Sequence, residues 1–406
     1  MTFGEQLNFE EASRQLNMAI ENGINFIDSA EMYPVPQNAR SQGKSEEYVG
    51  QWLKQKEFSR DKVFLATKSR TKKRDAVSNE ERWAGCWHSR GTDCADVAFV
   101  CCTDQLMLCK DVPTCWPETV QKSGDIAVDC WGCFWIDHIW GPSGQMTWIR
   151  GGPLCLDGKN IMDAVNGSLK RLQTDYIDLY QLHWPDRYVP MFGEVDYDPS
   201  CKYSSVPLEE QLEALSSAVS LGKVRHVGVS NETPFGVMEY CRLTKTFPKY
   251  ARIITIQNAY NLLCRTFDGG LAECCYEMRV SLLAYSPLAM GLLSGKYCGK
   301  DGGPSNARLN LYRGQYSEAE CRYNLSKPNV MPAVKAYVEI AQQYNVSPVA
   351  LAIGFVLRHP LAKSVVIGAT SRAQLQEILD GSQLEMTPQM MQDINQVHNR
   401  FPNPCP

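Results

Sequence analysis

The sequence predicts an α/β protein of the (β/α)₈ TIM barrel class, and two observations favour this fold. Short apolar runs rich in β-branched residues alternate with stretches of helical periodicity, which is the pattern of parallel β/α units. Polar side chains stand where successive predicted strands end, and active sites of β/α barrels are built on that face. A doubly wound sheet would also fit the alternation, but no Gly-x-Gly-x-x-Gly motif follows an early strand, which weakens that alternative.

The predicted elements follow one another in β/α order. The first is a helix over Phe9–Asn22, because its apolar residues have helical spacing and Gly23 suits the position after a helix. A later helix opens at Ser45, with two glutamates in its first turn. The full set is helix Phe9–Asn22, strand Ile24–Ile27, helix Ser45–Lys56, strand Val63–Thr67, helix Asn160–Leu172, strand Tyr176–Leu182, helix Leu208–Leu221, strands Val224–Val229, Ile253–Ile256 and Val280–Ala284, helix Ser347–Arg358 and strand Ser364–Ile367.

Residues 69–140 break this pattern and are predicted to be an irregular insertion in a barrel made of residues 1–68 and 141–406. Eight of the 17 cysteines and six of the nine tryptophans fall within them. The insertion could be a metal-binding subdomain using Cys130-x-x-Cys133, a disulfide-rich segment, or translated non-coding sequence such as a retained intron. A lone Cys-x-x-Cys is a weak metal signal. The last interpretation is favoured, because composition changes abruptly at both edges while the flanks are continuous with each other.

Composition and charge exclude several other classes. The chain of 406 residues is 44% hydrophobic and 21% charged, as in globular proteins, and its net charge of −4 offers no electrostatic case for binding nucleic acid. It has no run of about 18 apolar residues, so membrane insertion is not expected. As written, the first residues resemble neither a signal nor a transit peptide, which predicts a cytoplasmic protein with reduced thiols.

One motif carries a family resemblance. The segment Gly23-Ile-Asn-Phe-Ile-Asp28-Ser-Ala-Glu-Met-Tyr33 resembles the first signature of the aldo-keto reductases, and Lys68 and His183, each at the end of a predicted strand, match the rest of that family's catalytic tetrad. The resemblance covers Thr2–Lys68 and Gly141–Pro406. Within the family, the chain is similar to the branch that holds the Tas-like bacterial reductases, their plant relatives and the potassium-channel β subunits.

The chemistry of carbonyl reduction asks for these residue types. Hydride transfer leaves an alkoxide, which must be protonated. A tyrosine has an ordinary pKa of about 10, and a nearby ammonium lowers it. The resemblance implies that Tyr33 is the proton donor, that Lys68 tunes it, that Asp28 pairs with Lys68, and that His183 orients the carbonyl oxygen. Each residue alone also has an ordinary structural explanation, such as turn formation for Asp28 or packing for Tyr33.

The resemblance also implies an NADP(H) site. A flat aromatic at Tyr285 suits stacking under a nicotinamide ring, although a core aromatic is the ordinary alternative. Arg372 could pair with a 2′-phosphate, although it could equally be a surface charge. The residues implied in cofactor binding are Ser230, Asn231, Gln257, Tyr285, Ser286, Pro287, Leu288, Gly291, Lys296, Arg308, Gly368, Thr370, Ser371, Arg372, Gln374 and Glu377. The expected substrate is a small carbonyl compound, and Trp184 and the loop after it are expected to shape its pocket.

Two features depart from the family. The segment Met1–Gly4 resembles only the tail of the first barrel strand, so a truncated first strand is expected; an earlier start would supply the missing part and could carry an organelle presequence. The insertion begins one residue after Lys68, where cofactor and substrate come near.

The sequence therefore predicts a reductase of aldehydes or ketones that uses NADP(H) and has no metal site. Two alternatives remain open: a regulatory or redox-sensing protein that binds NADP(H) with little turnover, and a non-functional isoform. No sequence feature specifies the physiological substrate, the compartment or the oligomeric state.

Overall fold

A computed structural model describes residues 1–55, 59–69, 98–102, 105–109, 149, 156–191 and 193–406. The chain divides into two compact units, one of residues 1–73 and 145–406 and the other of residues 74–144. The first unit contains the predicted barrel and is described first.

Seven parallel strands form the sheet of the barrel unit, and each pairs with the next along the chain. This confirms the predicted parallel β/α fold. The strands are β1 (Phe26–Asp28), β2 (Phe64–Ser69), β5 (Ile177–Leu182), β6 (Val224–Ser230), β7 (Ile253–Ala259), β8 (Ser281–Tyr285) and β9 (Ala362–Val366). Because they are all parallel, their carboxyl ends meet at one edge of the sheet.

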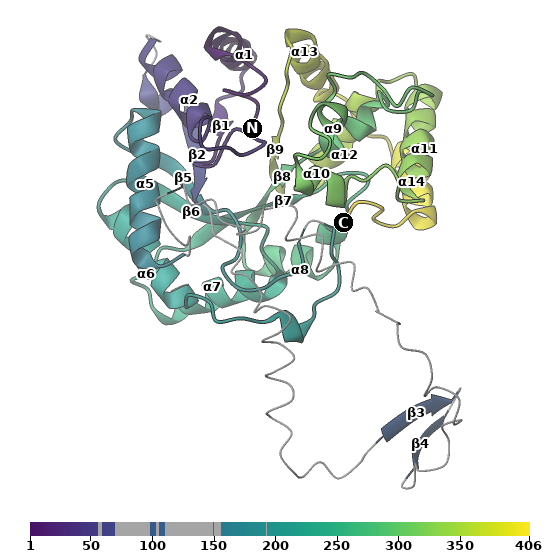
Figure 1. The fold of residues 1–406 in the computed structure, drawn as a ribbon, viewed down its shortest axis with the longest axis horizontal. Helices are drawn as coiled ribbons and strands as arrows, with labels where there is room; N and C mark the ends of the chain where they lie inside the picture. Colours follow the sequence, from purple (N-terminus) through teal and green to yellow (C-terminus); the bar gives the residue numbers. More distant parts are fainter. Residues whose placement is uncertain (56–58, 70–97, 103–104, 110–148, 150–155, 192) are drawn as a thin grey trace, which may run out of the picture. The chain divides into compact units, whose positions relative to one another are not determined.

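Helices surround the strands on the outside of the sheet (Figure 1). Neighbouring helices contact one another in the order α2, α5, α6, α7 and α8. The helices are α1 (Phe9–Glu21), α2 (Lys44–Gln55), α5 (Gly158–Leu172), α6 (Leu208–Ser220), α7 (Pro234–Thr246), α8 (Gly270–Glu277), α9 (Arg308–Leu311), α10 (Ser317–Arg322), α11 (Val330–Gln343), α12 (Pro348–Leu357), α13 (Arg372–Gly381) and α14 (Pro388–Arg400). Short 3-10 turns cover Arg60–Lys62, Pro199–Cys201, Thr266–Asp268 and Ala289–Ser294.

Local capping explains where several helices begin. Asn8 accepts a hydrogen bond from the backbone of Glu11, whose side chain accepts from the backbone of Asn8, so both ends of a capping box are present at α1. At α5, the side chain of Asp157 caps the helix by accepting a hydrogen bond from the backbone N–H of Asn160. The predicted boundaries of the helices named from the sequence are within two residues of those observed.

The core lies on both sides of the sheet. Outward-facing Leu65 and Tyr180 pack against the helices with Trp52, whose indole donates to Asn17 Oδ1 at 2.8 Å. Ala66 and Leu179 are adjacent to Leu65 and Tyr180 in their strands and face the other way, and they belong to a small separate cluster. This period-two alternation is expected of barrel strands, whose inward side chains fill the interior.

The truncated first strand predicted from Met1–Gly4 is not a strand in the structure. Residues 1–7 instead form a turn with a single bridge between Phe3 and Leu7. The described sheet therefore has β1 and β9 as its edges, and α1 contacts α13 beside them. The N-terminus lies next to β1 and β9 in Figure 1.

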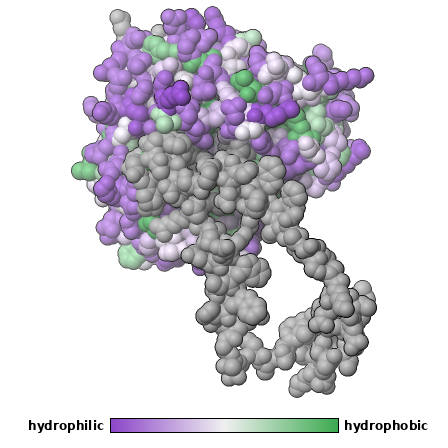
Figure 2. All heavy atoms as spheres, in the orientation of Figure 1, coloured by the Kyte–Doolittle hydropathy of each residue, from purple (hydrophilic) through white to green (hydrophobic). Residues whose placement is uncertain are grey.

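The surface of the barrel unit is mainly polar on the face visible in Figure 2, where apolar residues are scattered among hydrophilic ones. Among the described residues, no single helix has the length and hydrophobicity to cross a membrane; α11 and α12 reach that composition only as a pair bent by 96°.

In the second unit, the structure describes an antiparallel hairpin of β3 (Ala98–Cys102) and β4 (Gln105–Cys109). It lies within the segment predicted to be irregular. The motif Cys130-x-x-Cys133 lies outside the described residues. In the part of the chain that is described, no group of three His, Cys, Asp or Glu side chains could hold a metal ion.

We predict that replacing residues 74–144 with a short Gly-Ser linker leaves the barrel folded, because the two units are compact separately and loop-closure entropy changes slowly with length. The melting temperature should stay within about 3 °C of the full chain, roughly the shift that 1 kcal/mol causes in a large domain. Soluble yield should rise. A collapse of yield would show that residues 74–144 are needed for folding.

Candidate active site

Six polar or aromatic residues that the sequence placed at strand ends meet at the carboxyl edge of the sheet. Each comes from a different strand or from the residue just after one, so only the parallel arrangement brings them together. They are Asp28 in β1, Lys68 in β2, His183 after β5, Ser230 in β6, Gln257 in β7 and Tyr285 in β8.

Lys68 and Asp28 form a buried ion pair. The ammonium donates to Asp28 Oδ2 at 2.6 Å and to the main-chain oxygen of Ser29 at 2.7 Å, and the Lys68 side chain is 0% exposed. Burial lowers the pKa of Lys68 from its ordinary value, whereas the Asp28 carboxylate opposes this shift. Asp28 Oδ1 also accepts from the Gln257 amide at 2.9 Å. The carboxylate is therefore held between a cation and an amide donor.

Tyr33 and His183 stand beside this pair. The Lys68 ammonium lies 5.5 Å from the centre of the Tyr33 ring. The rings of Tyr33 and His183 meet edge to face with centroids 5.8 Å apart, and the His183 ring stacks on Trp184 at 3.9 Å. The structure thus brings together the four residues that the sequence named as a tetrad.

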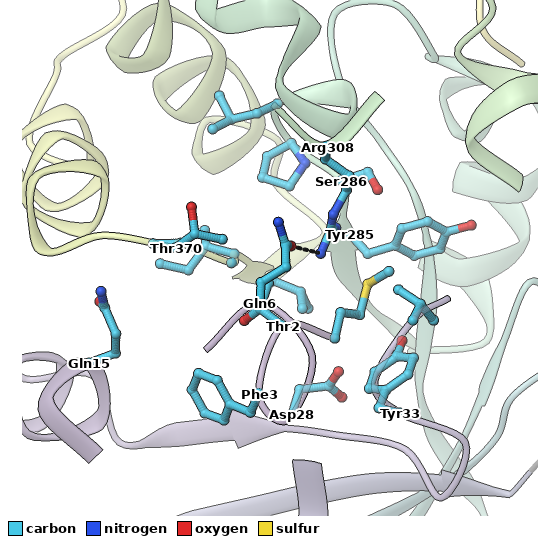
Figure 3. A pocket seen from close by; sticks show the side chains of 18 of the residues that line it. Thr2, Phe3, Gln6, Gln15, Asp28, Tyr33, Tyr285, Ser286, Arg308 and Thr370 are labelled. Carbon is cyan, nitrogen blue, oxygen red and sulfur yellow. Dashed lines mark hydrogen bonds between the residues drawn. The ribbon is translucent and has the colours of Figure 1, made fainter. Parts of the chain in front are cut away.

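A cavity of about 460 Å³ opens over these residues. Figure 3 shows Asp28 and Tyr33 on one side of it, Tyr285, Ser286 and Arg308 on the other, and Thr2 and Gln6 between them. The predicted site residues that line it are Asp28, Tyr33, His183, Trp184, Ser230, Asn231, Gln257, Tyr285, Ser286, Pro287, Leu288, Gly291, Lys296, Arg308, Gly368, Thr370, Gln374 and Glu377. Lys68 lies behind Asp28, and neither Ser371 nor Arg372 is part of the cavity wall.

One end of the cavity carries amide and hydroxyl groups held by short hydrogen bonds. Ser230 Oγ donates to the main-chain oxygen of Gln257 at 2.6 Å. Asn231 has a left-handed backbone with φ of 54°, and its Nδ2 donates to the main-chain oxygen of His183 at 2.9 Å. Tyr285 donates its hydroxyl hydrogen to Asn231 Oδ1 at 2.7 Å. These groups are fixed relative to the Tyr285 ring.

The end of the cavity that lies across from Asp28 and Tyr33 is also cationic. Arg308 donates to the uncharged acceptors Gln6 Oε1 at 3.2 Å and Met290 Sδ at 3.7 Å. Burial and the nearby Arg308 lower the pKa of Lys296, while Glu377 opposes the shift. Among the described residues, no carboxylate forms an ion pair with either cation. This end of the cavity therefore favours an anionic ligand.

Two local structures frame the cationic end. Met290 and Gly291 both have positive φ, which lets the loop after β8 turn sharply, and Lys296 packs against Gly291. At the start of α13, Ser371 caps the helix through the amide of Gln374, and Thr370 donates its amide to Gln374 Oε1 at 2.9 Å. Ser371 and Arg372 themselves are exposed.

Sequence reasoning missed three parts of this site. Gln181 donates to Asp28 Oδ1 at 3.4 Å, and its position two residues before His183 in the strand alternation could have indicated it. The segment Met1–Gln6 lines the cavity, but no motif marked it. Arg322 donates to the Tyr285 hydroxyl from α10, an element far from any strand end, so sequence position gave no signal for it.

A parallel barrel that gathers a buried lysine–carboxylate pair, a tyrosine and a histidine at its carboxyl edge defines an oxidoreductase of the β/α-barrel type. The family model of the aldo/keto reductases matches residues 1–93 and 145–399 of this chain. The chain belongs to the aldo/keto reductase family.

Three relatives show how far the similarity extends. Protein tas of Escherichia coli K12 is 36% identical over 406 residues, which cover 100% of this chain and 94% of the relative. An aldo-keto reductase of Babesia bovis is 42% identical over 275 residues, covering 64% of this chain and 94% of the relative. A putative voltage-gated potassium channel subunit beta of Schizosaccharomyces pombe is 27% identical over 254 residues, covering 61% of this chain and 66% of the relative.

We predict that D28N lowers the free energy of unfolding by about 3 kcal/mol at neutral pH, because it leaves a buried ammonium without its carboxylate. Asp28 raises the pKa of Lys68, so the variant lowers it further below the ordinary 10.5. Between the folded-state pKa and 10.5 the unfolded chain binds a proton that the folded chain lacks, so stability rises with pH there.

The difference in the free energy of unfolding between D28N and the wild type should therefore shrink as pH rises toward 10, as measured by urea unfolding. D163N is the matched control, since Asp163 pairs with Lys159 at 2.8 Å on an exposed surface; it should have little effect at any pH. A D28N deficit that is the same at pH 7 and pH 10 would contradict the pairing.

Proposed function

We propose that this chain reduces an aldehyde or ketone to an alcohol using NADPH. The observation that carries the proposal is the buried Lys68–Asp28 pair beneath Tyr33 and beside His183, at the wall of a cavity whose far end is cationic. The family membership supports an oxidoreductase, and these residues support the particular chemistry.

Tyr33 is the proposed source of the proton that the substrate oxygen receives. Tyr33 lines the cavity and its ring lies 5.5 Å from the Lys68 ammonium, a cation that favours the phenolate and so eases release of the hydroxyl proton. Asp28 keeps the ammonium in place and lowers the cost of burying it. Tyr33 would protonate the oxygen of the substrate as negative charge builds on it, and Lys68 would stabilise the phenolate that remains.

His183 has a positioning role in this proposal. Stacking on Trp184 at 3.9 Å and the edge contact with Tyr33 fix the plane of its ring at the cavity wall. From there the imidazole can donate to the same substrate oxygen that receives the Tyr33 proton. Trp184 would form part of the wall that contacts the rest of the substrate and excludes water.

The cavity is the proposed binding site of the dinucleotide. NADPH would supply the hydride, and the chain would hold its nicotinamide end with the Tyr285 ring and the amide groups of Asn231 and Gln257. Lys296 and Arg308 line another part of the cavity wall, where two cations without ion-pair partners among the described residues suit phosphate groups. Arg372, exposed at the start of α13, would reach a 2′-phosphate from outside the cavity wall.

A second function is a protein that binds NADP(H) and responds to its redox state with little turnover. The similarity to a putative potassium channel subunit beta favours it, and the same cavity would serve it. The two functions differ in one measurable quantity. The reductase oxidises NADPH in the presence of a panel of aldehydes and ketones, whereas the sensor retains NADPH tightly and oxidises it negligibly with all of them.

We predict that Y33F lowers kcat for carbonyl reduction by at least about a thousandfold, toward the upper range of general acid catalysis, while the Kd for NADPH changes less than about twofold, or 0.4 kcal/mol. Turnover is measured by NADPH absorbance and binding by fluorescence. Y276F is the matched control, because Tyr276 is 69% exposed on α8. Unchanged turnover in Y33F would remove Tyr33 from the role of proton donor.

We predict different effects for the two arginines assigned to the phosphates. R308A should weaken NADPH and NADH binding alike, by about tenfold or 1.4 kcal/mol, because it removes a cation from the pyrophosphate end. R372A should weaken NADPH binding by a similar factor and leave NADH binding unchanged. Equal loss of both cofactors in R372A would place the 2′-phosphate elsewhere.

A further inference from the structure

Arg322 reaches the cofactor end of the cavity from α10, outside the barrel strands. Its Nη1 donates to the Tyr285 hydroxyl at 2.8 Å, and its Nε donates to the main-chain oxygen of Pro406 at 3.1 Å. The guanidinium carbon lies 5.9 Å from the centre of the Tyr285 ring. Two bonds from different nitrogens fix the plane of the guanidinium group.

The bond from Arg322 sets the direction in which the Tyr285 hydroxyl donates. A guanidinium has donors only, so the Tyr285 oxygen must accept from it. The single hydroxyl hydrogen of Tyr285 is then free to donate onward to Asn231 Oδ1, which lies 2.7 Å away. Because Oδ1 faces Tyr285, Nδ2 of Asn231 faces the main-chain oxygen of His183 at 2.9 Å and Ser230 Oγ at 3.3 Å.

The amide of Asn231 has one possible orientation. Its Nδ2 faces the main-chain oxygen of His183, which can only accept, and Ser230 Oγ, whose hydrogen goes to the Gln257 main-chain oxygen. The backbone of Asn231 is left-handed with φ of 54°, and its backbone N–H donates to the Gln257 main-chain oxygen at 3.1 Å. Asn231 therefore presents Oδ1 as a fixed acceptor, and the Tyr285 hydroxyl is held between this acceptor and the Arg322 donor.

We propose that Arg322 is a positioning residue for the nicotinamide. It holds the Tyr285 hydroxyl against the fixed Asn231 amide, and so fixes the ring on which the nicotinamide would stack. The proposal rests on the proposed function, because it assigns the Tyr285 end of the cavity to the nicotinamide. Pro406 anchors Arg322 and thereby links residues near position 406 to the site.

The two-point geometry favours an arginine at this position. A lysine ammonium could donate to Tyr285, but its single nitrogen cannot hold the same two-point geometry across to Pro406. A leucine fills similar space and donates nothing. R322K should therefore retain part of the positioning effect on the Tyr285 ring, and R322L should retain none of it.

The test compares two ligands that differ only in the nicotinamide. NADPH carries the carboxamide, whereas 2′-phospho-ADP-ribose carries the same phosphates and adenine without the ring. In R322L the Kd for NADPH should rise about tenfold while the Kd for 2′-phospho-ADP-ribose stays within about twofold. R322K should fall between R322L and the wild type. A merely structural defect would weaken both ligands together.

Two further variants complete the test. R252L is the matched control, because Arg252 also donates to main-chain oxygens, those of Met278 and Arg279, but lies beside the start of β7; both Kd values should be unchanged. In the Y285F background, R322L should cause no further loss of NADPH affinity, since the hydroxyl through which Arg322 acts is gone.

The outcomes separate this inference from the proposed function. If the wild type binds neither ligand, the NADP(H) function itself fails. If the wild type binds both ligands, three results would each show that Arg322 has no positioning role while the function stands. R322L could bind NADPH as tightly as the wild type, or it could lose affinity for both ligands equally. The losses of NADPH affinity caused by R322L and Y285F could also be additive.

Discussion

The buried pair of Lys68 and Asp28 is the interaction on which the rest of the site depends. A fully buried ammonium is unfavourable without a partner, and here the partner comes from the neighbouring strand at a distance of 2.6 Å. The pair ties the ends of β1 and β2 together and places a cation beneath Tyr33. Gln257 and Gln181 donate to the remaining oxygen of Asp28, so the carboxylate connects four strands at one point.

Charge is distributed unevenly along the cavity, so its two sides suit different chemical groups. At the Tyr33 end the lysine is neutralised by its carboxylate, which leaves a polar but balanced surface suited to a carbonyl oxygen that becomes negative only during reaction. At the far end Lys296 and Arg308 have no ion-pair partner in the part of the chain that the structure describes, and each lowers the cost of bringing a phosphate into the cavity. A ligand with an anionic group and an uncharged reactive group matches the two sides of the cavity.

The site also draws on elements that do not belong to the strands. Arg322 on α10, itself held by the main chain at Pro406, donates to the Tyr285 hydroxyl, which donates in turn to Asn231. The direction of these bonds is consistent, because the guanidinium can only donate and Asn231 Oδ1 can only accept. The strands place the site residues, and this outer layer holds the Tyr285 ring among them.

The sequence by itself was sufficient for the parallel β/α fold, for the strand ends that carry Asp28, Lys68 and His183, and for the family resemblance, because strand and helix periodicity are local and the motif lies in one short segment. Most of the site residues that it indicated also line the cavity. Only the tertiary structure decided that residues 1–7 form a turn rather than a strand, that Gln257 donates to Asp28, that Arg372 stands outside the cavity wall, and that Arg322 reaches Tyr285. The reason is physical: the contacts of Gln257 and Arg322 join residues far apart in the chain, and the place that a terminal segment or a side chain takes against the barrel has no local signature.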